Sequence, residues 1–126
     1  MEENNRIIAE FMGYTLNEND EYPIEYITVQ GHWDTCSIQD LNYHKSWDWL
    51  MKVVEKIENT KIKDYSISTD ITDDKTFINV WHYGDGGKWS ILISNLNEEY
   101  KDFNKMQRTY KAVVKFINFY NKQKEE

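Results

Sequence analysis

Apolar residues recur at helical spacing in three parts of the chain. The first part is short: residues 6–12 place their apolar side chains on one face, and Gly13 follows as a natural C′ stop. The second begins after Ser46, the expected N-cap, with Asp48 in the first turn, where the helix dipole favours a negative charge. Its apolar stripe consists of Trp47, Leu50, Met51, Val54 and Ile57, with Trp49 and Val53 on the flank. We expect the first three residues of this stripe to be buried in the core.

The third helical pattern is long and closes the chain. Asn104 is the expected N-cap, and Gln107 three residues later completes a variant of the capping box. The apolar stripe consists of Met106, Tyr110, Val113, Val114, Ile117 and Tyr120, broadened by Ala112, Phe116 and Phe119. A helix with so wide an apolar surface is expected to pack against a sheet.

Strict alternation between these two long helices predicts strands. Residues 65–71 place Tyr65, Ile67, Thr69 and Ile71 on one face. Residues 76–83 place Phe77, Asn79, Trp81 and Tyr83 on one face and Ile78, Val80 and His82 on the other. A third strand spans 88–93, and turns at 72–75 and 84–87 join the three into an antiparallel meander.

The remaining segment, between the first two helices, is less regular. Pro23 marks a turn, residues 24–30 are rich in β-branched and aromatic side chains typical of a strand, and residues 31–42 are expected to form a loop. The whole pattern predicts a single α+β domain over residues 1–126. It consists of an antiparallel sheet of three to four strands packed against two main helices, plus a short N-terminal helix.

Chain length and cysteine content indicate what stabilises the fold and in which compartment the protein is expected. A chain of 126 residues buries roughly two thirds of its accessible surface on folding, so neither a disulfide nor a metal is needed for stability. The single cysteine, Cys36, and the lack of a signal-peptide pattern at the N-terminus predict a cytoplasmic protein. No stretch approaches the roughly 20 apolar residues of a membrane span.

Charge changes the expected partners. The chain carries 22 acidic and 15 basic residues, a net charge of −7, and only two of the bases are arginines. Nucleic-acid binding requires clustered Lys and Arg, which this chain lacks, so direct contact with DNA or RNA is disfavoured. The acids gather at residues 18–21, 70–74 and 98–102. Such a surface suits solubility or a basic partner.

Aromatic residues form 15% of the chain, and tryptophan and tyrosine are enriched at contact surfaces. Trp81, Tyr83 and Trp89 flank the Gly-rich hairpin, and we expect them to form a binding surface with His82 and Tyr65. The alternative is that the long helix covers these rings and makes them core. A second corner, with His44 and Trp49 at the start of the middle helix, is the other candidate.

Catalytic and metal-binding patterns are weak. His32, Cys36 and His44 lack the paired short spacings of a zinc site, and neither Cys36 nor a serine lies in a recognisable nucleophile motif. The carboxylates at 70–74 are explained by a turn, and residues 84–87 lack the remainder of a phosphate loop. We therefore expect a protein that is not an enzyme and uses no metal or cofactor.

Three segments together resemble a family of small proteins of unknown function encoded by bacteriophages and prophages, especially those of Bacteroidetes hosts. They are NRIIAEFMG (5–13), YHKSWDWLMKVVEKIE (43–58) and YKAVVKFINFYN (110–121), and they cover about a third of the chain. The resemblance implies a phage or prophage origin and a place in the host cytoplasm, and it transfers no catalytic residue. Small phage accessory proteins often bind host factors, including defence nucleases, which is an argument by association.

Two functions follow as hypotheses. The first is a non-enzymatic accessory protein that binds a host protein, and inhibition of a defence nuclease is one version of this hypothesis. The second is a small-molecule or nucleotide binder with an aromatic pocket. Exposed aromatic residues would also serve a homodimer.

Overall fold

The computed structural model describes residues 2–13, 15–16, 24–27, 33–36, 41–62, 64–82 and 87–125, with side chains described within 3–13, 41–62, 64–82 and 87–123. Its elements in chain order are α1 (Glu2–Phe11), β1 (Thr15–Leu16), β2 (Ile24–Ile27), β3 (Trp33–Cys36), α2 (Trp47–Asn59), β4 (Tyr65–Ile71), β5 (Lys75–His82), β6 (Lys88–Ser94), η2 (Glu98–Tyr100) and α3 (Lys105–Glu125). The fold is α+β, as the sequence predicts.

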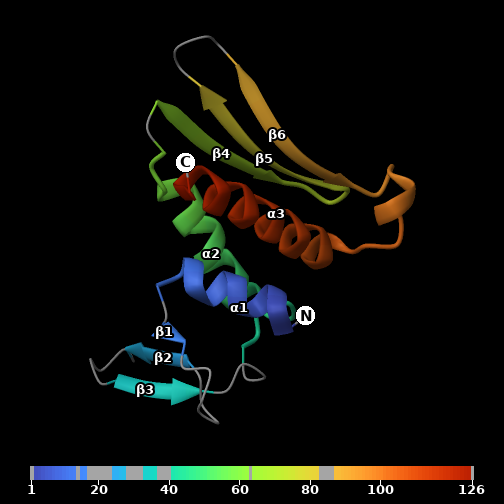
Figure 1. The fold of residues 1–126 in the computed structure, drawn as a ribbon. Helices are drawn as coiled ribbons and strands as arrows, with labels where there is room; N and C mark the ends of the chain where they lie inside the picture. The colour runs from blue at the N-terminus through green and yellow to red at the C-terminus, as the bar shows by residue number, and fades with distance from the viewer. Residues whose placement is uncertain are drawn as a thin grey trace.

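The strands form two antiparallel sheets with the orders β1-β2-β3 and β4-β5-β6. Figure 1 shows α2 and α3 on one side of the β4-β5-β6 sheet, with α1 against α3 and the small sheet beyond α1. Helix α3 contacts β5 and β6, and α2 contacts β4. The hydrophobic core therefore lies between the larger sheet and the helices.

The helix ends follow local sequence signals. Asn104 Oδ1 accepts a hydrogen bond from the Gln107 backbone N–H at 2.8 Å, and Gln107 Oε1 accepts one from the Asn104 N–H at 2.8 Å, so the predicted capping box is confirmed. Gly13 adopts φ +93° and its N–H donates to the Glu10 carbonyl after α1, as expected of a C′ glycine. Ser46 stands at the N-cap of α2, although its side chain makes no capping hydrogen bond.

The buried stripe of α2 differs from the prediction. Leu50 is buried together with Val53, Val54 and Ile57. Trp47 and Met51 are 36% and 38% exposed, so the expectation that they belong to the core is wrong. Each residue turns a helix by about 100°, and the stripe is centred near Leu50 and Val53, which leaves Met51 on the outer flank.

The irregular N-terminal region contains more strand than expected. Residues 33–36 form β3 in antiparallel pairing with β2, which corrects the prediction of a loop over 31–42. The predicted strand at 24–30 is described at 24–27, and a two-residue strand, β1, pairs with it. Tryptophan and threonine at positions 33 and 35 are the strand-forming signal that the loop prediction overlooked.

No helix within the described residues combines the length and the apolar character needed to cross a bilayer.

Candidate functional site

The register of the larger sheet assigns the predicted site residues to opposite faces. Trp89 pairs with Val80, and Tyr65 pairs with His82, whereas Trp81 pairs with Lys88. Directly opposite residues share a face and successive residues alternate. Trp89, Tyr65 and His82 therefore lie on the helix-covered face, and Trp81 lies on the other. The expected joint surface of Trp81, Trp89 and Tyr65 is thus divided in two by the sheet.

The second face of this sheet is uncovered by any described element (Figure 1). We call it the open face and define it by Ser66, Ser68, Asp70, Phe77, Asn79, Trp81, Lys88, Ser90 and Leu92. Trp81 and Leu92 are 42% and 43% exposed, and Phe77 is partly buried. Phe77 and Leu92 are cross-strand neighbours at one end of the face, and Trp81 lies at the other end.

Polar groups separate and border these apolar side chains. The middle row contains Ser68, Asn79 and Ser90, and Ser90 Oγ donates to Asn79 Oδ1 at 2.7 Å. The Lys88 ammonium lies 4.6 Å from the centre of the Trp81 ring. The open face thus combines exposed apolar side chains with hydrogen-bonding groups, the two kinds of group that contact sites between macromolecules contain.

Carboxylates gather where the open face meets the β4–β5 turn and η2. The two segments are joined there, since the Asn95 N–H donates to the Asp74 carbonyl at 3.1 Å. We call this the acidic end and define it by Asp70, Asp73, Asp74, Glu98, Glu99 and Asp102. Two ion pairs are formed here, Lys101 with Glu98 at 3.0 Å and Lys105 with Asp73 at 3.7 Å. The predicted clusters at 70–74 and 98–102 therefore occupy one end of the sheet, and the cluster at 18–21 lies outside the described residues.

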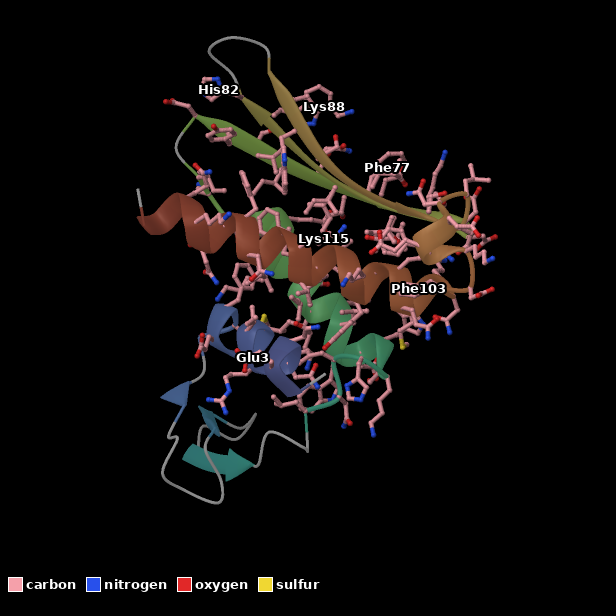
Figure 2. The ribbon with its side chains drawn as sticks, turned by 45° about the vertical axis from the view of Figure 1, so that its right-hand side comes forward. Glu3, Phe77, His82, Lys88, Phe103 and Lys115 are labelled. Carbon is pink, nitrogen blue, oxygen red and sulfur yellow. The ribbon has the colours of Figure 1, made fainter. Side chains whose placement is uncertain are left out.

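The helix-covered face has an open cavity at the surface, of about 340 Å³, where β5 ends and β6 begins; the described residues that line it are Tyr65, Val80, His82, Gly87, Lys88 and Trp89. The Trp89 ring stacks on Phe119 of α3, with centroids 4.1 Å apart and an interplanar angle of 17°. Tyr65 and His82 form the second ring pair, with centroids 4.8 Å apart. Figure 2 shows His82 and Lys88 near the hairpin and Phe77 farther along the sheet. The cavity thus gathers three of the predicted site residues.

The corner at the start of α2 is a buried polar junction. Asn5 lies between two rings: its amide nitrogen is 3.1 Å from His44 Nδ1, and its Oδ1 accepts a hydrogen bond from the Tyr110 hydroxyl at 2.9 Å. Burial, followed by the charges of Lys45 and the N-terminus, lowers the pKa of His44 from its ordinary 6.5. Burial raises the pKa of Tyr110 to about 12. These contacts join α1, α3 and the turn before α2, so His44 has a structural role here.

Trp49 packs within the same corner. Its ring meets Tyr43 edge to face, with centroids 5.2 Å apart, and it lies against the core. The ring contacts of His44 and Trp49 are with Tyr110 and Tyr43, and not with the aromatic residues of the larger sheet. The described site residues predicted from the sequence therefore form three separate groups.

Several candidates remain without structural description. Tyr83 and His32 lie outside the described residues, and only the backbone of Cys36 is described. Within the part of the chain that the structure describes, no group of three or more His, Cys, Asp or Glu side chains is placed to hold a metal ion.

Two residues of the open face were not selected from the sequence. Phe77 shares the face of Trp81 by simple alternation, and that placement was predicted without being connected to a site. Leu92 lies in an ordinary strand pattern, and only the pairing of β5 with β6 identifies it as exposed.

Comparisons with known proteins give no relative: no family model, no curated protein and no solved structure matches the chain.

Proposed function

We propose that the protein is a non-enzymatic accessory protein that binds a host protein through the open face. The observation that carries this proposal is the exposure of Trp81 at one end, and of Leu92 opposite Phe77 at the other end, of a sheet face that no described element covers. Exposed apolar surface bordered by polar groups is a common feature of contact sites, and tryptophan is over-represented among the residues that dominate binding energy.

The size of the open face favours a partner that reaches beyond it. Three strands of seven to eight residues present roughly 350 Å², from a spacing of about 4.8 Å and a rise of about 3.4 Å per residue. A stable complex buries about 800 Å² on each partner. A partner that also covers the acidic end gains contact area beyond that of the open face.

The charge of the acidic end favours a basic partner surface. Of its six carboxylates, Glu98 forms an ion pair with Lys101 and Asp73 forms one with Lys105. Complementary charge speeds association and suppresses wrong partners. The resemblance to phage proteins makes a host protein the expected partner, and the basic substrate-binding surface of a defence nuclease has the matching chemistry.

The test is affinity capture with the tagged protein from a Bacteroidetes lysate, using variants matched for exposure. Trp81→Ala/Leu92→Ala removes the apolar side chains of the open face. Trp47→Ala/Met51→Ala removes a tryptophan and a methionine of α2 that are 36% and 38% exposed and outside that face. We expect one basic protein to be retained by the wild type and by Trp47→Ala/Met51→Ala, to be lost from Trp81→Ala/Leu92→Ala, and to elute as salt screens the charges.

Equal retention of every captured protein by the wild type and the double variant would contradict this function. If the retained protein is a nuclease, its cleavage rate with and without the wild-type protein decides whether binding inhibits it.

A second function, small-molecule binding, is favoured by a separate observation. The open cavity where β5 ends and β6 begins is lined by Tyr65 and His82, whose rings are paired, and by Trp89, whose ring stacks on Phe119. Concave sites lined by aromatic side chains with a few polar groups are typical of ligand pockets. Its test is titration with aromatic ligands.

A further inference from the structure

We propose that two copies of the chain pair through the outer edge of β6 and so form one antiparallel sheet of six strands. This inference goes beyond the proposed function and does not depend on it, because the pairing uses the backbone of an edge strand and leaves the open face uncovered. Its experiment contains no host protein, so the two proposals succeed or fail independently.

Hydrogen bonds at both ends of β6 show which of its backbone groups face outward. The His82 N–H donates to the Gly87 carbonyl at 2.8 Å, and the Asn95 N–H donates to the Asp74 carbonyl at 3.1 Å, both in the register of β5 with β6. Alternate residues of an antiparallel strand bond to the same neighbour, so the odd-numbered residues of β6 bond to β5. The even-numbered residues turn their N–H and C=O groups to the other side, where no strand of the described residues pairs with β6.

The edge of β6 lacks the features that usually keep two sheet edges apart. Charged side chains, prolines, bulges and covering segments serve that purpose in natural sheets. β6 pairs with β5 residue by residue from Lys88 to Ser94, without a bulge or a proline, and its one charged residue is Lys88 at its start. Ser90 and Leu92 occupy the middle of the edge, and both are exposed. This edge is therefore open to a further strand.

The opposite edge of the sheet, β4, is more polar. Its exposed side chains are those of Ser68 and Asp70. Six described large apolar side chains are exposed, and three of them, Trp89, Leu92 and Leu96, belong to β6 or follow it within two residues. Pairing at β6 therefore removes more apolar surface from water than pairing at β4 does.

The charges along this edge favour a second copy in antiparallel orientation. Lys88 lies at one end of β6 and is exposed. At the other end, the Asn97 N–H donates to the Ser94 carbonyl at 3.2 Å, which holds η2 with Glu98 and Glu99 beside the strand. Antiparallel pairing brings the Lys88 end of each copy to the acidic end of the other, whereas parallel pairing would join two acidic ends. Opposite charges across a pair of strands stabilise it, and like charges destabilise it.

The register follows from the outward-facing groups. A symmetry axis at Ile91 places Ser90 of each copy opposite Leu92 of the other, and these two pairs exchange two N–H···O bonds each. The Ser94 carbonyl, which already accepts a bond, then lies at the end of the paired region.

The helix layer leaves room for this arrangement. Helix α3 contacts both β5 and β6. With strands about 4.8 Å apart, a helix centred between β5 and β6 lies about 2.4 Å inside β6, and the symmetry axis lies about 2.4 Å outside it. The α3 helices of the two copies are then about 10 Å apart, a distance at which helices pack side by side. Lys115 of α3 donates to the Tyr100 hydroxyl of its own chain at 2.7 Å.

The experiment is sedimentation velocity of the purified full chain over a range of concentrations, together with amide hydrogen exchange followed by NMR. The mass is expected to rise from 15.2 kDa towards twice that value as the concentration increases. The amides of Ser90 and Leu92 are expected to exchange more slowly as the dimer forms, because their N–H groups become bonded. A single species of 15.2 kDa at all concentrations up to about 1 mM would overturn the proposal.

The outer edge of β4 provides an internal control. The Thr72 N–H donates to the Lys75 carbonyl at 2.8 Å, in the register of β4 with β5. By the same alternation, Ile67 and Thr69 turn their N–H groups outward from β4. Their exchange is expected to be independent of protein concentration. A dimer that protects these two amides, and leaves those at the edge of β6 unprotected, would overturn the proposal.

Variants matched in charge test the edge directly. Leu92→Lys places a positive charge in the middle of the β6 edge, and Ser68→Lys adds the same charge at an exposed position of β4. Ser90→Pro removes an outward N–H without removing a bond to β5. We expect Leu92→Lys and Ser90→Pro to weaken dimerisation at least about tenfold, and Ser68→Lys to dimerise as the wild type does. Wild-type dimerisation in both folded β6 variants would contradict the proposal.

Amide spectra of the variants show whether they fold. If the β6 variants do not fold, the wild type decides through a sample in which labelled and unlabelled chains are mixed. Nuclear Overhauser contacts between Ser90 of one copy and Leu92 of the other support the pairing, and their absence in the dimer overturns it.

Discussion

Replacing Arg108 tests how the acidic end of the sheet is held in place. The side chain is 1% exposed, and its guanidinium donates to the carbonyls of Phe103 at 2.8 Å, Thr72 at 3.3 Å and Asp73. One side chain thus joins the turn before α3 to the turn between β4 and β5. Without it, these two turns lose their shared donor, and the carboxylates around them lose their fixed spacing.

The magnitude follows from two opposing effects. Hydrogen bonds to a charged group contribute about 1.5–3 kcal/mol each, and Arg108 makes three. Burying a guanidinium costs several kcal/mol, which offsets much of this gain. Arg108→Met keeps most of the volume and removes both effects, so we expect the free energy of unfolding to fall by about 2 kcal/mol. Arg108→Ala also leaves a cavity, which brings the loss to about 4 kcal/mol.

Urea unfolding followed by tryptophan fluorescence measures these losses, because the five tryptophans report the transition. The order of stability is expected to be wild type, then Arg108→Met, then Arg108→Ala. A methionine variant as stable as the wild type would refute the reasoning, because the three carbonyl contacts would then contribute nothing beyond packing.

Further predictions concern four residues. Burial lowers the pKa of His44, so the unfolded chain takes up a proton at this residue more readily than the folded chain as pH falls below about 6.5. Thermal unfolding between pH 7.5 and 5 should therefore show that stability decreases as the pH is lowered, and that it decreases less in His44→Asn. Tyr110→Phe removes the hydroxyl bond to Asn5 and should cost about 1–2 kcal/mol by urea unfolding; an unchanged midpoint would show that this bond has no net effect. In the wild type, the pKa of Tyr110 of about 12 means that the contribution of its neutral form is lost as pH rises from about 10 to 12, and circular dichroism of the phenylalanine variant should lack that step. Asn104→Ala breaks the capping box and should cost about 1 kcal/mol, with Asn97→Ala as the exposed control. Gly13→Ala meets no neighbour within 4 Å but is strained at φ +93°, so it should cost about 1 kcal/mol by the same measurement, and no loss would show that α1 ends without this constraint.

The helices were predictable because their signals are local. The capping box of α3 is written in Asn104 and Gln107, and the hydrogen bonds form as that motif requires. The apolar stripe predicted for α3 is also confirmed, because Val113, Phe116 and Ile117 are buried. For α2 the same spacing left two choices of centre, and the packing of Val53 against the core decided against Trp47 and Met51.

The sequence alone does not predict that Trp81 and Trp89 lie on opposite faces of the sheet. Alternation assigns Trp81 a face relative to Phe77, but the face of Trp89 depends on the pairing across the hairpin. A change of pairing by one residue moves every side chain of a strand to the other face. The pairing of Trp81 with Lys88 therefore decides that Trp89 faces the helices, and no local pattern specifies it.

The difference in composition between the two faces of the sheet explains which of them the helices cover. Ile78 and Val80 present β-branched surface to α3, and Thr76 forms a buried hydroxyl contact with Thr109 at 3.2 Å. The opposite face offers Asn79 between Phe77 and Trp81, and burying that amide under a helix would require a partner for it. The helices therefore cover the more uniformly apolar face, and Trp81 remains exposed.

The most direct measurement of the central claim uses the two tryptophans on opposite faces of one sheet. The indole N–H signals of Trp81 and Trp89 are followed by NMR while the captured partner is added to the labelled protein. The proposed function predicts that the Trp81 signal shifts or broadens and that Trp89 changes much less. A complex in which Trp89 responds and Trp81 does not would contradict binding through the open face.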